Sequence, residues 1–163
     1  MIAHNLVLIA FILLMGTAAF EDFRRFIIPN PLTIGLCVLW PLYFATAPSL
    51  AAALSAIGCG AAVFIVGAVL FARGYVGGGD VKLLSAAALW AGPAGIANLL
   101  VLTGILGGAL ALFLLVPAGS RVTAAARGLL GQPTPDSAAP RYVPYGVPIA
   151  IAAVIVVLSP NLA

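Results

Sequence analysis

Long apolar runs are the feature that most constrains what this chain can fold into. Hydrophobic residues make up 64% of its 163 residues, and charged residues only 7%. A soluble domain has roughly 45–50% apolar and about 25% charged residues. A hydrocarbon core ~30 Å thick is crossed by ~20 helical residues, and lipid requires backbone hydrogen bonds to close within each segment, which favours helices. The sequence therefore predicts an all-α, polytopic membrane protein.

The lengths of the runs predict six transmembrane helices. The run at 83–117 is too long for one span, and AGPAG at 91–95 predicts a break within it. The expected spans are residues 5–20, 31–47, 51–72, about 81–91, about 96–116 and 143–158. The Gly-, Pro- and Ser-rich stretch at 118–142 predicts a mobile loop. The first run lacks the basic start of a signal peptide, and we expect one membrane-embedded domain over 1–163.

The basic residues predict the orientation. All seven fall in the odd-numbered loops of this arrangement: Arg24, Arg25, Arg73, Lys82, Arg121, Arg127 and Arg141. By the positive-inside rule these loops are cytoplasmic, and the N- and C-termini lie outside. The net charge of +3 is then an orientation signal, and so dispersed a set of basic residues gives nucleic-acid binding almost no support.

Acidic residues are few, and their positions are informative. Glu21, Asp22 and Asp80 lie at expected helix ends on the same side, whereas Asp136 lies in the Pro-rich loop, where a solvated carboxylate is ordinary. A carboxylate at membrane depth is costly and needs a partner or a task.

Three glycines, Gly77, Gly78 and Gly79, precede Asp80. They allow positive φ and the close approach of another extended chain. They also place Asp80 near a helix N-terminus, where unpaired N–H groups favour negative charge. The alternative is a flexible turn with an N-capping Asp.

Asp22 and Asp80 are candidates for a catalytic pair. Two carboxyl groups that approach each other cannot both ionise readily, so one takes a proton from water while the other donates to the carbonyl oxygen. That division of labour hydrolyses a peptide bond without a metal. The alternative for Asp22 is a surface ion pair with Arg25. Glu21 is a rival for the same role, but adjacent helical residues point about 100° apart, so only one can face Asp80 well.

Two prolines follow Asp22 along the chain. Pro29 and Pro31 set a turn close to Asp22, and Asn30 between them can bond its own backbone. Lys82 faces another direction from Asp80 on a helix. It either lowers the pKa of a neighbouring carboxylate or extends its ammonium group to the lipid headgroups.

The segment YVPYGVPIA at 142–150 opens the last helix with Pro144, Gly146 and Pro148. A proline in mid-helix would free backbone groups that could receive a substrate strand, and the alternative is a packing kink.

The sequence gives little support to a disulfide, a metal centre or a phosphate-binding loop. Cys37 and Cys59 lie inside expected helices at different depths and read as buried thiols. His4 alone cannot build a His-rich metal centre, and the Gly-Lys-Ser/Thr of a phosphate loop is absent. We expect no metal and no cofactor.

Three motifs resemble one family. GGGDVK at 77–82 is similar to the G-x-G-D signature of the membrane aspartyl proteases that process type IV prepilins. EDFRRFIIPN at 21–30 resembles the family's other Asp motif, and VPYGVPIA resembles the Pro-Tyr/Phe-Gly segment that starts its last helix. They occur in the family's order over about residues 20–150.

The resemblance implies that Asp22 and Asp80 are the catalytic residues. The implied supporting residues are Gly77, Gly78, Gly79, Lys82, Pro29 and Asn30, with Gly77 and Gly79 shaping the approach to Asp80. The implied substrate is a membrane-inserted pilin precursor, cut at the cytoplasmic face of the bacterial inner membrane after a glycine that ends a short basic leader. The compact chain looks most like the branch that serves Flp-type tight-adherence pili. The two Cys pairs of longer, methylating relatives are missing, so methyltransferase activity is not expected.

A small ion or proton channel, or a transporter, is the alternative function. It would use Asp22 and Asp80 as ion ligands. Such a protein needs charges along a path across the bilayer, whereas here both carboxylates are expected near one face.

Overall fold

The computed structural model describes residues 2–45, 49–132 and 143–159, and within these ranges the regular elements are all helices. They are α1 (Ile2–Arg25), α2 (Asn30–Phe44), α3 (Leu50–Ala72), α4 (Gly78–Leu115), α5 (Pro117–Leu129) and α6 (Gly146–Leu158). The all-α prediction is confirmed. Asp136 and Arg141 lie outside the described residues.

Three helices, α1, α3 and α4, are long and apolar enough to cross a membrane, and α2 and α6 are apolar but shorter. Their lipid-compatible surface is extensive, since large apolar side chains such as Val38, Ile65 and Ile105 are 68%, 63% and 62% exposed. A soluble protein would not leave so much apolar surface in water. The chain is a membrane protein.

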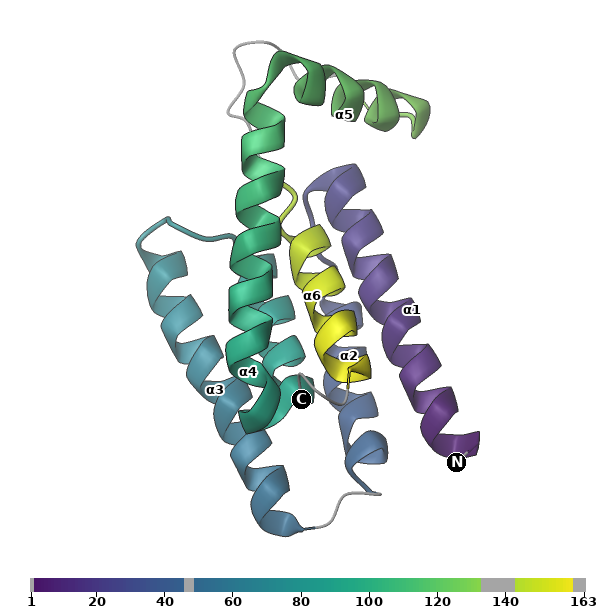
Figure 1. Ribbon diagram of the computed structural model, residues 1–163, viewed down its shortest axis with the longest axis vertical. Helices are drawn as coiled ribbons and strands as arrows, with labels where there is room; N and C mark the ends of the chain where they lie inside the picture. Colours follow the sequence, from purple (N-terminus) through teal and green to yellow (C-terminus); the bar gives the residue numbers. More distant parts are fainter. Residues whose placement is uncertain (1, 46–48, 133–142, 160–163) are drawn as a thin grey trace.

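The long helix α4 changes direction at Gly92, as the AGPAG sequence predicts. Gly92 has φ 62° and ψ −171°, and Pro93 follows it. A positive φ is strained for a residue with a Cβ, so glycine suits this corner, and proline cannot continue the hydrogen-bond ladder. The second segment of α4 returns alongside the first (Figure 1).

Helix α5 corrects the prediction of a mobile loop from 118 onwards. Pro117 lies in the first turn, where its missing N–H costs nothing, and the Ala-rich stretch 124–126 favours a helix. Of the glycines that suggested a loop, Gly119 lies in the first turn of this helix, Gly128 in its last turn and Gly131 just beyond its end, whereas the rest of the predicted loop, 133–142, lies outside the described residues. Figure 1 shows α5 crossing the end of the bundle, above the C-terminal end of α1.

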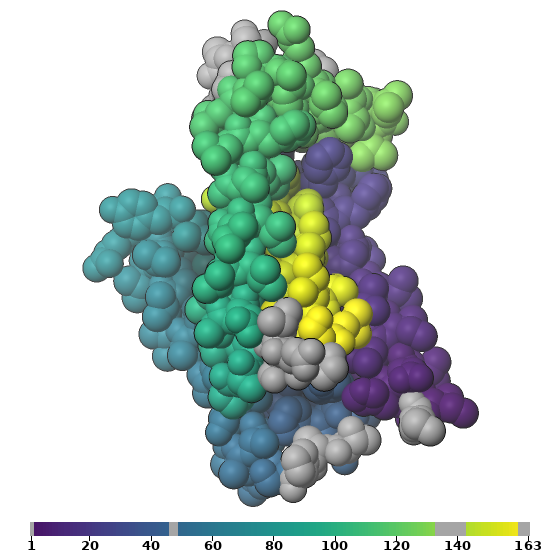
Figure 2. Space-filling view, in the orientation of Figure 1, coloured from purple at the N-terminus to yellow at the C-terminus, as the bar shows by residue number. Residues whose placement is uncertain are grey.

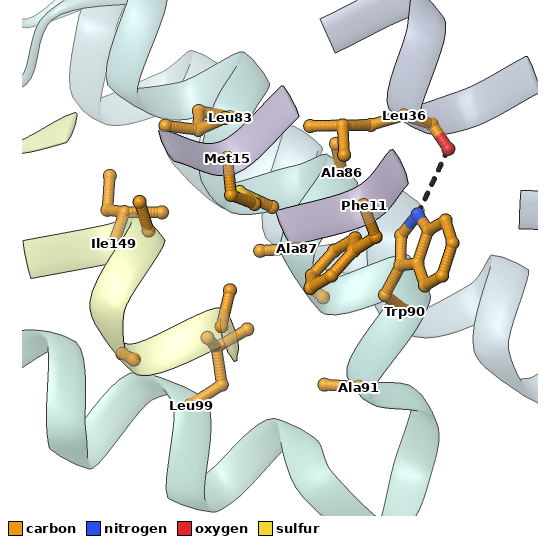
Figure 3. Close-up of a cluster of buried hydrophobic side chains, with 14 of the residues drawn as sticks. Phe11, Met15, Leu36, Leu83, Ala86, Ala87, Trp90, Ala91, Leu99 and Ile149 are labelled. Carbon is orange, nitrogen blue, oxygen red and sulfur yellow. Dashed lines mark hydrogen bonds between the residues drawn. The ribbon is translucent and has the colours of Figure 1, made fainter. Parts of the chain in front are cut away.

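The core holds α1, α4 and α6 together. Its fully buried side chains include Phe11 and Met15 from α1, Leu83 and Leu99 from α4, and Ile149 from α6 (Figure 3). Between them lie small residues that let helix backbones approach closely: Ala86, Ala87, Ala88, Ala150, Ala152 and Ala153. In the space-filling view α6 fills the space between α4 and α1 (Figure 2).

This packing brings three helix ends to one end of the bundle: the end of α1, the start of α4 and the start of α6 (Figure 1). One polar contact inside the core helps to align the helices, because the indole N–H of Trp90 donates to the carbonyl of Leu36 at 3.0 Å. The candidate site lies where the three ends meet.

Candidate active site

Asp22 lies in the last turn of α1 and is only 5% exposed. Its carboxylate oxygen Oδ2 accepts a hydrogen bond of 2.6 Å from the backbone N–H of Gly146. Gly146 is the first residue of α6, where backbone N–H groups have no partner within the helix and the helix dipole favours negative charge. The start of α6 therefore binds the Asp22 carboxylate.

Gly146 has to be a glycine for this contact to form. A Cβ added to it would lie 2.8 Å from Cβ of Asp22 and 2.9 Å from its Oδ2. Real Cβ atoms do not approach that closely, so a side chain here would push α6 and α1 apart. The close approach, rather than any unusual φ, explains the residue.

Asp80 lies in the first turn of α4, two residues after the helix begins, and is half-buried. Its carboxylate turns back and accepts a hydrogen bond from the backbone N–H of Gly77, the N-cap residue. This is the acidic half of a capping box, in which the third helical residue satisfies the N-cap N–H. The alternative in which Asp80 is itself the N-cap is wrong.

The carboxyl groups of Asp22 and Asp80 interact electrostatically. The two residues come from the end of α1 and the start of α4, 58 positions apart in the sequence, and both are shielded from bulk solvent. At short range in such an environment two negative charges repel strongly. Two carboxyl groups that interact in this way do not both ionise readily.

The glycines before Asp80 serve close packing, and the expected positive φ is wrong. Gly77 has φ −69°, and the positive-φ glycines of the described chain are Gly74, Gly92 and Gly131. A Cβ on Gly77 would lie 2.8 Å from Oδ2 of Asp80. The absence of a side chain therefore gives the Asp80 carboxylate its position.

The other two glycines admit neighbouring chains. A Cβ on Gly78 would lie 3.2 Å from the ring of Phe71, and one on Gly79 would lie 3.2 Å from Cβ of Ile28. Ile28 belongs to the turn between α1 and α2. The expected close approach of another segment is thus present, and at Gly79 that segment is the protein's own α1–α2 turn.

Glu21 is separated from the pair. Its carboxylate forms an ion pair with Arg25 one helical turn away, at 3.4 Å. The ion pair considered for Asp22 belongs instead to its neighbour, and Asp22 turns inward. Of the two adjacent acids, the structure brings Asp22 to Asp80.

Outside the carboxyl pair lie Pro29, Asn30 and Lys82. Pro29 is the N-cap residue of α2, and the side-chain oxygen of Asn30 accepts a 3.0 Å hydrogen bond from Nζ of Lys82. This bond ties the start of α2 to the first turns of α4. Lys82 is two residues from Asp80, about 200° around the helix, so it points away from the carboxyl pair.

Helix α5 is attached to the α1–α2 turn by Arg127. Its guanidinium donates to the carbonyl of Arg24 at 3.3 Å and lies 4.1 Å from the centre of the Phe26 ring. Phe26 adopts φ 55°, a conformation that costs a residue with a Cβ roughly 1–2 kcal/mol. The cation–π contact helps to hold this turn, which carries the chain from Asp22 towards Ile28 and Gly79.

Sequence reasoning missed Gly146 and Arg127 as parts of the site. The Pro-Tyr-Gly sequence that leads into α6 was a usable signal for Gly146, because a nearby proline favours a helix start and a glycine there permits close backbone contact. Pro148 lies in the first turn of α6, so both earlier interpretations of it as a mid-helix proline are wrong. Nothing in the sequence marked Arg127, whose partners lie about a hundred residues away.

Chemically, the site offers two interacting carboxyl groups, each of which accepts a hydrogen bond from a backbone N–H. Such a pair can deprotonate a water molecule and protonate a leaving group. Within the described residues no group of three or more His, Cys, Asp or Glu is placed to hold a metal ion.

Comparison with known proteins places this arrangement in a family. The model of the type IV leader peptidase family matches residues 9–112, which include Asp22, Asp80 and the three glycines. No curated protein and no solved structure matched the chain. Since the family model covers more than half of the sequence, the chain belongs to the type IV leader peptidase family.

Proposed function

We propose that this peptidase is an aspartic endopeptidase that uses Asp22 and Asp80 to hydrolyse one peptide bond of a prepilin. The observation that carries the proposal is the meeting of these two carboxyl groups, from distant parts of the chain, within the segment that the family model matches. In the reaction one carboxylate takes a proton from water, and the resulting hydroxide attacks the scissile carbonyl carbon. The other carboxyl group protonates the carbonyl oxygen, which gives a tetrahedral intermediate. The proton taken from water then passes to the leaving nitrogen, the C–N bond breaks, and a hydroxyl of the intermediate returns a proton to the second carboxylate.

The place of the pair at one end of the bundle supports a cut close to the membrane surface. The basic residues of the described chain gather at the same end: Arg24, Arg25, Arg73, Lys82, Arg121 and Arg127. Under the positive-inside rule this end faces the cytoplasm. We propose that six spans, with α4 contributing two, place the active site at the cytoplasmic face of the bacterial inner membrane and both termini outside.

The proposed substrate is a type IV prepilin of the Flp-like kind. Its short basic leader would remain in the cytoplasm, and its hydrophobic helix would lie in the bilayer. The support is the resemblance of the three motifs to prepilin peptidases, together with a catalytic pair at the membrane edge, where leader and helix join.

A direct test is co-expression with a set of epitope-tagged prepilins, followed by gel electrophoresis and mass spectrometry of the pilin. We expect a Flp-like precursor to lose its leader after the glycine that ends it, with an unmethylated new N-terminus. A precursor in which that glycine is replaced by a bulky residue serves as the control and should remain uncut. Failure to process any Flp-like precursor would refute the assigned substrate.

Chelators should leave cleavage unchanged. In the proposed reaction both proton transfers are made by carboxyl groups, and no step requires a Lewis acid. With purified enzyme and prepilin in detergent, the initial rate should be the same with and without excess EDTA. Loss of activity that is restored by zinc would contradict the two-aspartate mechanism.

A further inference from the structure

An apolar groove lies on the surface formed by α2, α3 and the first segment of α4. Its volume is about 600 Å³. Its walls include Cys37 and Val38 of α2 and Ala61 and Phe64 of α3, and α4 contributes Lys82 and Leu89. Val38 and Phe64 are 68% and 48% exposed. The side chains of the groove would face acyl chains in a membrane.

Among the described residues, Lys82 is the only charged one that lines the groove. Its ammonium group donates to the neutral side chain of Asn30, and among the described residues no ion pair to it is formed. It lies at the end of the bundle that gathers the basic side chains. An apolar groove with one cation at its end complements a molecule that joins an anionic group to a hydrocarbon chain.

The groove and the catalytic pair lie on different faces of α4. Lys82, Ser85, Ala86 and Leu89 recur at helical spacing and line the groove, whereas Asp80 points about 200° away from Lys82. Ile28 packs against Gly79 between the two regions. A peptide bound at the carboxyl pair would have to pass around this contact to enter the groove, which favours a lipid over the substrate's helix as the occupant.

We propose that the groove binds a phospholipid with an anionic headgroup, whose phosphate accepts a hydrogen bond from Lys82 and whose acyl chain lies between α2 and α3. Basic sites between transmembrane helices at the cytoplasmic side bind anionic headgroups. The long stem of Lys82 can lie along the apolar wall while its ammonium group reaches the headgroup region. The proposal concerns lipid binding and does not depend on the peptidase mechanism.

Trp40 provides a probe, because it lines the groove and Trp90 does not, although both tryptophans are largely buried in the core. Purified, delipidated protein in detergent is mixed with phosphatidylglycerol or phosphatidylcholine carrying brominated acyl chains, and tryptophan fluorescence is followed. We expect saturable quenching, with half-saturation at an about fivefold lower mole fraction for phosphatidylglycerol, since one lysine contributes about 1 kcal/mol to binding an anionic lipid. Trp40→Phe should remove the saturable quenching.

Two matched pairs of variants locate the site. Lys82→Met should reduce binding of phosphatidylglycerol to the level of phosphatidylcholine, whereas Arg73→Met, at the same end but outside the groove, should not. Ala61→Phe should fill the groove and abolish saturable quenching, whereas Ala62→Phe, also exposed on α3 but outside the groove, should leave it intact.

Equal affinity of the wild type for both lipids, or an unchanged preference in Lys82→Met, would overturn the proposal. The proposal would also be overturned if Ala61→Phe and Ala62→Phe changed the quenching to the same extent. Light scattering adds a separate outcome: a dimer that Ala61→Phe dissociates would assign the groove to a second copy of the chain instead.

Discussion

Replacing either Asp22 or Asp80 by Asn is expected to abolish leader removal. The amide has nearly the shape of the carboxyl group but cannot accept or donate the proton that the reaction transfers. General acid–base catalysis by one group contributes about 10²–10⁴-fold, so each variant should process a prepilin at least about a hundredfold more slowly. The measurement is the initial rate of leader removal by purified enzyme, supported by the gel shift in co-expressing cells.

Glu21→Gln is the matched control for Asp22→Asn. It removes a carboxylate from the adjacent position of the same helix, but one that forms an exposed ion pair with Arg25. Such pairs contribute at most about 1 kcal/mol to stability, so activity should stay within about twofold of the wild type. An inactive Glu21→Gln with an active Asp22→Asn would reassign the pair. Equal amounts of each variant in the membrane fraction exclude a folding defect.

Gly146→Ala should cause the second large loss of activity. The added Cβ would lie within 3.0 Å of three atoms of Asp22, so α6 and α1 must separate and the 2.6 Å hydrogen bond from the Gly146 N–H must lengthen. Overpacking of this kind costs typically 1–3 kcal/mol. Because this cost destabilises the arrangement in which Asp22 is bound by α6, kcat/KM for prepilin cleavage should drop by roughly ten- to a hundredfold.

Gly16→Ala offers the comparison for Gly146→Ala. Gly16 lies on α1 like Asp22, but a Cβ added to it has no neighbour within 4 Å. The substitution also favours the helix by about 1 kcal/mol, so it should leave cleavage unchanged and raise the thermal stability slightly. Similar activity of the two variants would show that the contact between α6 and Asp22 is unimportant for catalysis.

The two aspartates and Gly146 differ in how readily a sequence identifies them as parts of the site. The sequence singled out the two aspartates, together with Glu21, because acids are so rare in this chain that each one at a helix end requires a reason. Gly146 could not be selected with the same force. Its contribution is a backbone N–H, which every residue except proline carries, and only its distance from Asp22 makes it a partner.

The glycine triplet illustrates how two different uses of glycine look alike in a sequence. The sequence indicated that Gly77, Gly78 and Gly79 serve Asp80, and they do lie around it. Two uses were expected, positive φ and close approach. Positive φ is absent, since Gly77 has φ −69°, whereas close contacts are present, and Gly77 is small so that the Asp80 carboxylate can fold back over it. Glycine permits both unusual dihedrals and close contacts, and a sequence does not distinguish the two.

Helix α5 shows how amino-acid composition alone led to a wrong prediction. Glycines and prolines on both sides of the Ala-rich stretch 124–126 suggested a loop, and α5 nevertheless extends from Pro117 to Leu129. Pro117 begins it, and Gly131, with φ 73°, follows its end. Proline at a helix start and glycine just beyond its end are helix boundary signals. The same residues therefore delimit a helix as readily as they populate a loop.

The sequence by itself determined that the chain is a helical membrane protein, that its fourth long apolar run turns at AGPAG, and that the acids at helix ends, Glu21, Asp22 and Asp80, are the candidates for chemistry. Those conclusions follow from local chemistry: hydrocarbon thickness, the helix-breaking effect of Gly-Pro, and the cost of a carboxylate in lipid. Only the tertiary structure decided which of the adjacent acids Glu21 and Asp22 turns inward, that α6 binds Asp22 through Gly146, and that Arg127 reaches the α1–α2 turn. Each of these depends on how helices distant in the sequence pack, because side-chain direction and interatomic distance are set by that packing.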